Sequence, residues 1–300
     1  MMKQADFNTL VRLAMKTHNY GHMRPVVEKE LLQYDILFSL DRERLLDSLT
    51  FQGGTSLRLC YGSPRFSEDL DFTGGPDFDG RRLQGIASCI EKYVGRRYGL
   101  EVAVKEPTDI ESESDYAALS IDKWQVAVIT APERRDVPRQ RIKIEVANIP
   151  SYSREPKPLL INYGFLPDGY GDILILTETL DEVMADKLIS LVNTARYVRY
   201  RDIWDLRWLK LRGASIQPIW IQKKIDDYGI DDYLCKIDNM RQRLPDIIRG
   251  EPFRKEMMRF IPMDVQERTL NRSTFYDFLV VEIGNLLQSL KRNLNAREYE

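Results

Sequence analysis

Residues 51–72 read FQGGTSLRLCYGSPRFSEDLDF, and this stretch decides which fold and chemistry the chain can have. Near its start lie Gly53 and Gly54, which let the backbone approach a ligand closely because neither residue has a β-carbon. A short helix is predicted from Thr55 to Tyr61, so free N–H groups and the positive end of a helix dipole lie at the same place. Together these features indicate a turn that binds phosphate.

The same stretch ends in two aspartates on a short predicted strand. Asp69 and Asp71 lie on either side of Leu70, so both carboxylates project from one face while the leucine packs on the other. Two like charges so close favour a shared cation, and Mg²⁺ (or Mn²⁺) prefers carboxylate, phosphate and water oxygens. The pair therefore predicts a metal–nucleotide site. Taken singly, the glycines would also fit a tight turn, and the aspartates an exposed edge strand.

Apolar periodicity divides the whole chain into two lobes of an α/β (α+β) protein. Residues 1–176 are expected to form two opening helices and a mixed sheet, and residues 177–300 a helical lobe. The active site is expected in the groove between the lobes. Helices are predicted at 6–17, 26–47, 55–61, 79–98, 178–195, 202–212, 217–227, 231–247 and 275–292, and strands at 49–51, 70–72, 100–105, 118–130, 140–148 and 172–176.

Composition excludes several classes of protein. The 44 basic and 46 acidic residues give a net charge of -2, so a nucleic-acid partner must be met by a local basic patch. The cysteines, Cys60, Cys89 and Cys235, have no metal-ligand spacing and indicate a reducing cytoplasm. With only His18 and His22, acid–base chemistry must use carboxylates. No apolar run approaches the roughly 18 residues of a membrane span, so no membrane partner is expected.

Three further charged residues are candidates for the site. Glu145 alternates with apolar strand residues, so it faces away from the core and can bind metal or accept a proton; otherwise it is a surface glutamate. Lys187 lies on a predicted helix, where a lysine is usually a solvated charge. Asp202 fits a helix cap, and Asp205 can pair with Arg201 one turn away.

The span 193–212, NTARYVRYRDIWDLRWLKLR, has six arginines and lysines against two aspartates. Four aromatic residues are interleaved with these charges: Tyr197, Tyr200, Trp204 and Trp208. Basic and aromatic side chains together can hold phosphates and stacked bases, but aromatics at helical spacing also form helix cores, and both interpretations stay open. A second basic run either widens the patch or forms an exposed loop; it consists of Arg134, Arg135, Arg139, Arg141 and Lys143.

The sequence resembles the DNA polymerase β-like nucleotidyltransferase superfamily, whose signature is a glycine followed by Gly, Ser or Thr, a spacer and Asp-x-Asp. Gly54-Thr55 and Asp69-Leu70-Asp71 match it. More narrowly, the chain is similar to the AbiEii-type toxins of bacterial toxin–antitoxin and abortive-infection systems. The matching segments, in the family's order, are Gly53–Leu57, Arg65–Phe72, Lys143–Val146, Glu182–Leu188 and Arg201–Leu206, with Asp186 standing where the family often has glutamate.

The resemblance implies a nucleotidyltransferase that takes an NTP and adds nucleotides to RNA, with the tRNA 3′ end as the expected acceptor. Growth arrest or abortion of phage infection would follow. The implied metal ligands are Asp69, Asp71 and Glu145, and the implied catalytic residues are these three with Lys187 and Asp202. The implied nucleotide contacts are Gly53, Gly54, Thr55, Arg65, Ser67 and Lys187.

The candidate partners are the NTP, a tRNA held by the span 193–212, and a cognate antitoxin. Two other functions stay open. The same carboxylates would serve nucleotide transfer to a small molecule or a protein side chain. A catalytically silent nucleotide-binding module is the second alternative, although it would not need Asp69, Asp71 and Lys187 all intact.

Overall fold

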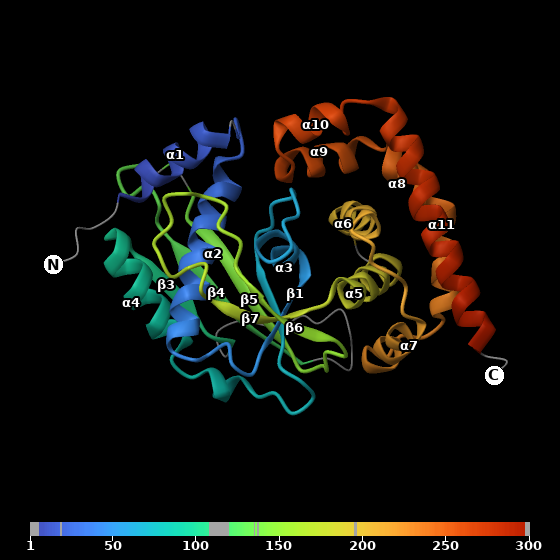
Figure 1. Ribbon diagram of the computed structural model, residues 1–300, viewed down its shortest axis with the longest axis horizontal. Coiled ribbons are helices and arrows are strands. Elements are labelled where there is room, and N and C mark those ends of the chain that lie inside the picture. The colour runs from blue at the N-terminus through green and yellow to red at the C-terminus, as the bar shows by residue number, and fades with distance from the viewer. Residues whose placement is uncertain are drawn as a thin grey trace. The chain divides into compact units, whose positions relative to one another are not determined.

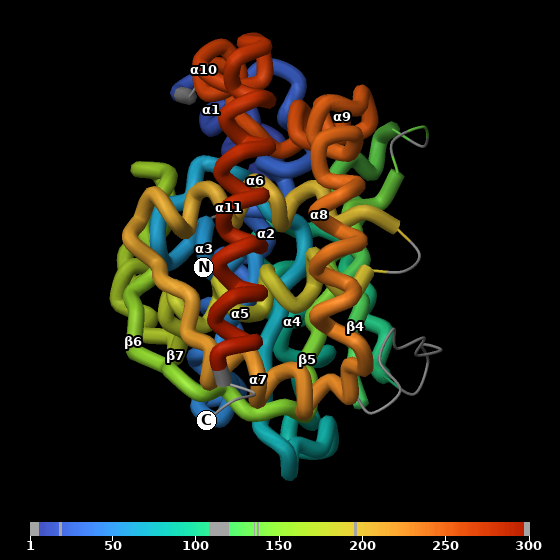
Figure 2. Tube along the Cα trace, turned by 90° about the vertical axis from the view of Figure 1, so that its right-hand side faces the viewer, coloured from blue at the N-terminus to red at the C-terminus, as the bar shows by residue number. Residues whose placement is uncertain are grey.

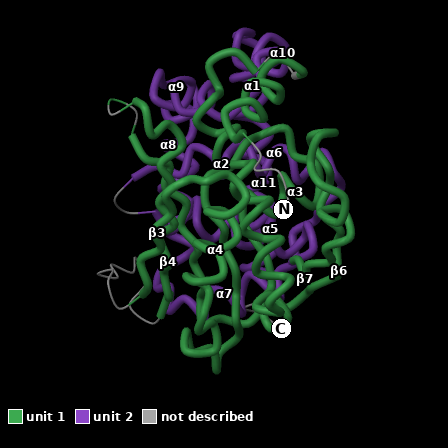
Figure 3. Tube along the Cα trace, turned by 90° about the vertical axis from the view of Figure 1, so that its left-hand side faces the viewer, with its two compact units in different colours: residues 1–114, 119–177 green, residues 115–118, 178–300 purple. Residues whose placement is uncertain are grey.

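The computed structural model describes residues 6–18, 20–107, 120–134, 136, 138–194 and 197–297. Internal contacts divide the chain into two compact units, drawn in green and purple in Figure 3. Unit 1 comprises the described residues up to Thr177, and unit 2 comprises those from Glu178 onward. The expected α/β architecture, with a helical C-terminal part, is confirmed.

Unit 1 is built on a seven-stranded sheet of order β3-β4-β5-β2-β1-β7-β6. The sheet is mixed, as predicted, because β1–β7 and β2–β5 pair in parallel whereas β1–β2, β3–β4 and β4–β5 pair antiparallel. The strands are β1 (Thr50–Gln52), β2 (Leu70–Thr73), β3 (Val102–Lys105), β4 (Ile121–Val128), β5 (Gln140–Ala147), β6 (Arg154–Pro158) and β7 (Leu174–Glu178).

Two helices of unit 1 cover one face of this sheet. Figure 1 shows α2 and α4 on the same side of the strands. Apolar residues of β4 and β5 face these helices and are at most 2% exposed, among them Trp124, Val126, Ile142 and Ile144. Removing these side chains from water is the main force that holds the layers together. The helical elements of unit 1 are α1 (Phe7–His18), α2 (Arg24–Arg42), α3 (Gly53–Leu59), the 3₁₀ helix η1 (Gly80–Leu83) and α4 (Ile86–Tyr98).

Unit 2 is helical, and its long helices α8 and α11 run side by side (Figure 2). They bury apolar residues at helical spacing, such as Ile237 and Leu244 from α8 and Leu287 from α11. Among the residues described, none of the helices has the length and apolar character needed to cross a lipid bilayer. The helices are α5 (Leu180–Val192), α6 (Tyr200–Leu211), α7 (Pro218–Asp227), α8 (Tyr233–Arg249), α9 (Glu251–Phe260), α10 (Met263–Arg268) and α11 (Ser273–Arg297).

Prolines and glycines account for three departures from the predicted elements, and the short helix α10, also not predicted, begins directly after Pro262. Strand β6 contains two prolines, which a ladder tolerates because β6 is an edge strand. Helix α9 was missed because Pro252 interrupts the apolar pattern, yet proline in a first helical turn removes no needed hydrogen bond. The predicted helix 79–98 is divided at Gly85, whose φ is +96°, into η1 and α4.

Candidate active site

The turn from β1 into α3 requires both of its glycines. Helix α3 begins at Gly53 rather than at Thr55 as predicted, and Gly53 has a left-handed φ of +75°. A β-carbon on Gly53 would lie 2.6 Å from an Asp71 carboxylate oxygen. A β-carbon on Gly54 would lie 2.3 Å from the Arg65 guanidinium and 2.8 Å from the Ser67 hydroxyl. The glycines therefore let two predicted nucleotide contacts and one predicted metal ligand approach the same turn.

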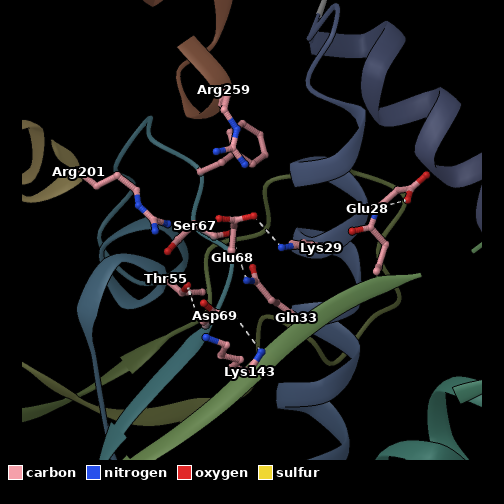
Figure 4. Close-up of polar contacts among 12 residues, drawn as sticks. Glu28, Lys29, Gln33, Thr55, Ser67, Glu68, Asp69, Lys143, Arg201 and Arg259 are labelled. Atoms are coloured by element: carbon pink, nitrogen blue, oxygen red, sulfur yellow. Dashed lines mark hydrogen bonds and ion pairs between the residues drawn. The ribbon is translucent and has the colours of Figure 1, made fainter. Parts of the chain in front are cut away.

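The polar side chains around this turn also hold the loop that leads to the aspartates (Figure 4). The Thr55 hydroxyl donates a short hydrogen bond to the carbonyl oxygen of Asp69. Arg65 is 2% exposed and donates to the carbonyl of Phe66 at 2.8 Å. Gln33 of α2 donates to the carbonyl of Ser67 at 3.2 Å. Thr55 and Arg65 thus both have structural partners within unit 1.

The structure places Asp71 and Glu145 side by side on one face of the sheet. They are register partners in the parallel strands β2 and β5, so their side chains project in the same direction. Asp69 immediately precedes β2, and its carboxylate accepts a hydrogen bond from the backbone N–H of Lys143 at 2.9 Å (Figure 4). The three predicted metal ligands therefore come from two adjacent strands and from the residue that leads into one of them.

Burial and nearby charges set the electrostatics of these carboxylates. Burial raises the pKa of Asp69 above its ordinary value, although the N–H and the charge of Lys143 oppose this shift. Glu145 forms an ion pair with Lys123 at 3.4 Å, and Glu68 forms one with Lys29 at 2.7 Å. A half-buried carboxylate such as Asp69 gains from an added positive charge.

The carboxylates of this site suit a divalent metal ion whose remaining ligands come from the substrate and from water. Within the described ranges, no three His, Cys, Asp or Glu residues form a group that could hold a metal ion by themselves. Magnesium usually needs only one or two carboxylates, with phosphate and water oxygens as its other ligands. Asp71, beside the Gly53–Gly54 turn and in register with Glu145, meets that requirement.

In unit 2, the predicted residues Lys187 and Asp202 contact each other directly. The Lys187 ammonium lies 2.7 Å from Asp202 and 3.3 Å from Asp205, and its side chain is only 14% exposed. The Ser190 hydroxyl donates to the other Asp202 oxygen at 2.6 Å. Lys187 is therefore no solvated surface charge, and Asp205 pairs with it.

A buried charge cluster in unit 2 was missed by the sequence reasoning. Lys224 of α7 is fully buried and lies 2.7 Å from Asp186, 3.1 Å from Glu182 and 3.8 Å from Glu178. Burial alone would lower the pKa of Lys224, but the carboxylates raise it well above its ordinary value. One signal was available: Glu182 and Asp186 stand four residues apart, so on a helix they stack on one face and repel each other unless a cation intervenes.

The basic and aromatic span 193–212 contributes more to the core than to the surface. Trp204 and Trp208 are 1% and 8% exposed, so they belong to the packing of α6. Arg207 packs its guanidinium over Trp204, and Lys210 pairs with Glu282 of α11 at 2.9 Å. Two residues keep the character of a binding surface: Tyr197 is 55% exposed, and the guanidinium of Arg199 lies over its ring. Arg135 and Arg196 lie outside the described residues.

Substituting alanine for Gly54 should destabilise unit 1 by about 1–3 kcal/mol and reduce nucleotide transfer, because its β-carbon would lie 2.3 Å from the buried Arg65 guanidinium and displace it from its place beside the turn. Urea unfolding and transfer rates measure the two effects. Gly164→Ala is the matched control, since a β-carbon there meets nothing within 4 Å and its φ is not left-handed. Equal stability of the two variants would show that the turn tolerates a side chain.

Comparison with known proteins gives the family. The family model described as nucleotidyl transferase AbiEii toxin, type IV TA system, matches residues 35–279. Among solved structures, the MenT4 nucleotidyltransferase toxin from Mycobacterium tuberculosis is 18% identical over 95% of this chain and 98% of its own, with a TM-score of 0.52, and so shares the fold. JHP933 from Helicobacter pylori is 17% identical over 91% and 95%, with a TM-score of 0.46. No curated protein sequence matches. The chain belongs to the AbiEii family of nucleotidyltransferase toxins of type IV toxin–antitoxin systems.

Proposed function

We propose that this nucleotidyltransferase uses Mg²⁺ or Mn²⁺ to transfer nucleotides from an NTP to the 3′ end of a tRNA in the cytoplasm. The observation that carries the proposal is the register of Asp71 with Glu145 beside the Gly53–Gly54 turn. Blocking the tRNA 3′ end would prevent aminoacylation and stop growth, which also limits phage multiplication. The family implies an NTP substrate and a cognate antitoxin.

The chain's own residues have separate tasks in this reaction. The bound metal would supply positive charge to the triphosphate and to the acceptor hydroxyl. The Gly53–Gly54 backbone lets the phosphates approach closely, and Asp69 and Asp71 would hold the metal. Glu145 accepts the proton of the acceptor hydroxyl while the hydroxyl oxygen attacks the α-phosphorus. The bond from the α-phosphorus to pyrophosphate breaks, and pyrophosphate leaves with its electron pair.

We propose that Lys187 supplies positive charge to the departing pyrophosphate, while Asp202 and Asp205 keep the lysine charged and oriented. Lys187→Ala should then lower the transfer rate at saturating NTP by about 10²-fold and change the apparent NTP affinity less, because the interaction strengthens as the charge develops. Lys187→Arg should restore only part of the rate. Single-turnover kinetics measure both.

A purely structural role for Lys187 predicts a different result. Loss of the ion pairs would destabilise unit 2, but the rate per folded molecule would stay at the wild-type value in both variants. Unfolding curves measured beside the kinetics separate the two roles.

The proposed reaction is tested by incubating the protein with each labelled NTP, Mg²⁺ and total bacterial RNA. We expect label in tRNA, and we expect prior removal of the 3′-terminal hydroxyl by periodate oxidation to abolish it. Labelling of tRNA that survives the oxidation would contradict a 3′ acceptor. Labelling of a small molecule or of a protein instead of RNA would identify the other acceptor classes that the same carboxylates can serve.

A further inference from the structure

The sheet face of unit 1 that carries Asp71 and Glu145 also carries a row of cations. Side chains alternate along β5, so Arg141 and Lys143 project from the same face as Glu145. The intervening residues of β5 are the apolar ones that pack beneath α2 and α4. The cations therefore lie on the face opposite these helices.

The row continues across the sheet from β5 to β3. Lys143 is the register partner of Gln125 in β4, and Gln125 is the register partner of Lys105 in β3. Register partners project from the same face, so Lys105 extends the row to the strand at the sheet edge. The cationic face, as we name it, consists of Lys105, Arg141 and Lys143, and it leads away from the carboxylates on β2 and β5.

The members of the cationic face differ from two exposed arginines that lie near them in the sequence. All three are exposed, and in the described part of the chain none of them lies within ion-pair distance of a carboxylate, although the charge of Lys143 also acts on Asp69. Nearby exposed arginines are neutralised: Arg134 pairs with Asp136 at 2.6 Å, and Arg139 approaches Glu101 at 3.9 Å.

The spacing of these charges suits a polymer of phosphates. Alternate residues of one strand lie ~7 Å apart, and strands two places apart are separated by ~10 Å. A single triphosphate would bind at the turn beside Asp71, whereas Lys105 lies three strands from β2 in the order β2-β5-β4-β3. A row of this extent matches several successive phosphates of a nucleic-acid backbone.

We propose that the cationic face binds the phosphodiester backbone of the RNA acceptor and guides its end to the carboxylates. The identification of this polymer as RNA rests on the proposed function. Lys105, Arg141 and Lys143 contribute affinity without reading sequence, because they contact phosphates rather than base edges.

The test compares two double variants of the full chain that remove the same charge from opposite sides of the sheet. Arg141→Gln with Lys143→Gln changes the cationic face. Lys92→Gln with Arg96→Gln changes exposed residues of α4, which covers the other face. Binding of fluorescently labelled bulk tRNA is measured by anisotropy over a range of salt concentrations. Arg141→Lys with Lys143→Arg keeps the charge and serves as the rescue.

We expect the cationic-face variant to bind tRNA about tenfold or more weakly near 0.1 M salt, with a slope of log K against log salt that is smaller by about 1.5. The α4 variant and the charge-preserving variant should match wild type. An unchanged slope in the cationic-face variant, or an equal loss in the α4 variant, would overturn the proposal.

The outcome is independent of whether transfer occurs. Loss of tRNA binding only in the cationic-face variant, in a protein that transfers nucleotides to no RNA, would support this surface and refute the proposed function. Labelled tRNA together with wild-type binding by the cationic-face variant would support the function and refute this surface.

Discussion

Replacing Asp71 with asparagine should reduce nucleotide transfer by about a thousandfold or more, equivalent to about 4 kcal/mol of transition-state stabilisation. The amide keeps the size of the side chain beside Gly53 but removes the charge that would bind the metal. Single-turnover transfer at saturating NTP and Mg²⁺ gives the rate. Asp77→Asn, at an exposed position in the loop after β2, is the matched control.

Asp69→Asn should have a similar effect on the rate without weakening the fold. Burial already disfavours the ionised form of Asp69, as its raised pKa shows, so a neutral side chain of the same shape is no less stable there. We expect the unfolding midpoint of the variant to equal or exceed that of wild type. A folded Asp69→Asn, Asp71→Asn double variant that transfers at the wild-type rate would remove both residues from the active site.

Replacing Lys224 with methionine should lower the free energy of unfolding of unit 2 by about 3–5 kcal/mol. Lys224 is fully buried, and its loss leaves Glu178, Glu182 and Asp186 together without their cation. Urea unfolding measures the effect. Lys223→Met is the matched control, since the neighbouring lysine is exposed and a substitution there should change stability by at most about 0.5 kcal/mol.

The loss in Lys224→Met should depend on pH in a defined direction. Burial and the charge of Asp186 raise the pKa of Glu178 well above its ordinary value even with Lys224 present. A carboxyl whose pKa is raised on folding favours the folded state at low pH, and this contribution is lost as pH rises through the folded-state pKa. The difference between variant and wild type should therefore be larger at pH 8 than at pH 5. A stability difference between variant and wild type that does not change with pH would show that the three carboxylates do not cause the loss of stability.

The local sequence pattern was sufficient to predict that the carboxylates lie on the sheet face turned away from the core. Alternation along two short strands predicted that Asp71 and Glu145 face away from the core, and the parallel register of β2 and β5 places them together. What alternation could not give was the pairing of β2 with β5, because register between strands distant in sequence depends on the whole sheet.

Contacts between helices that are far apart in the sequence could not be predicted from it. The partner of Lys187 was not evident, because Asp202 and Asp205 fit a helix cap and a local ion pair equally well. Lys224 reads as one of two adjacent lysines on an amphipathic helix, and only packing of α7 against α5 separates it from Lys223. Burial of Trp204 likewise depends on Phe275 of α11, which packs against it.

The prolines of β6 have a consequence for how the protein behaves in a crowded cell. An edge strand with free N–H groups is a template on which another chain can add a strand, and repeated addition leads to aggregates. Pro156 and Pro158 have no N–H to offer, and Arg154 and Lys157 add charge to the same short strand. The sheet thus ends at this edge in a strand that resists growth into intermolecular assemblies.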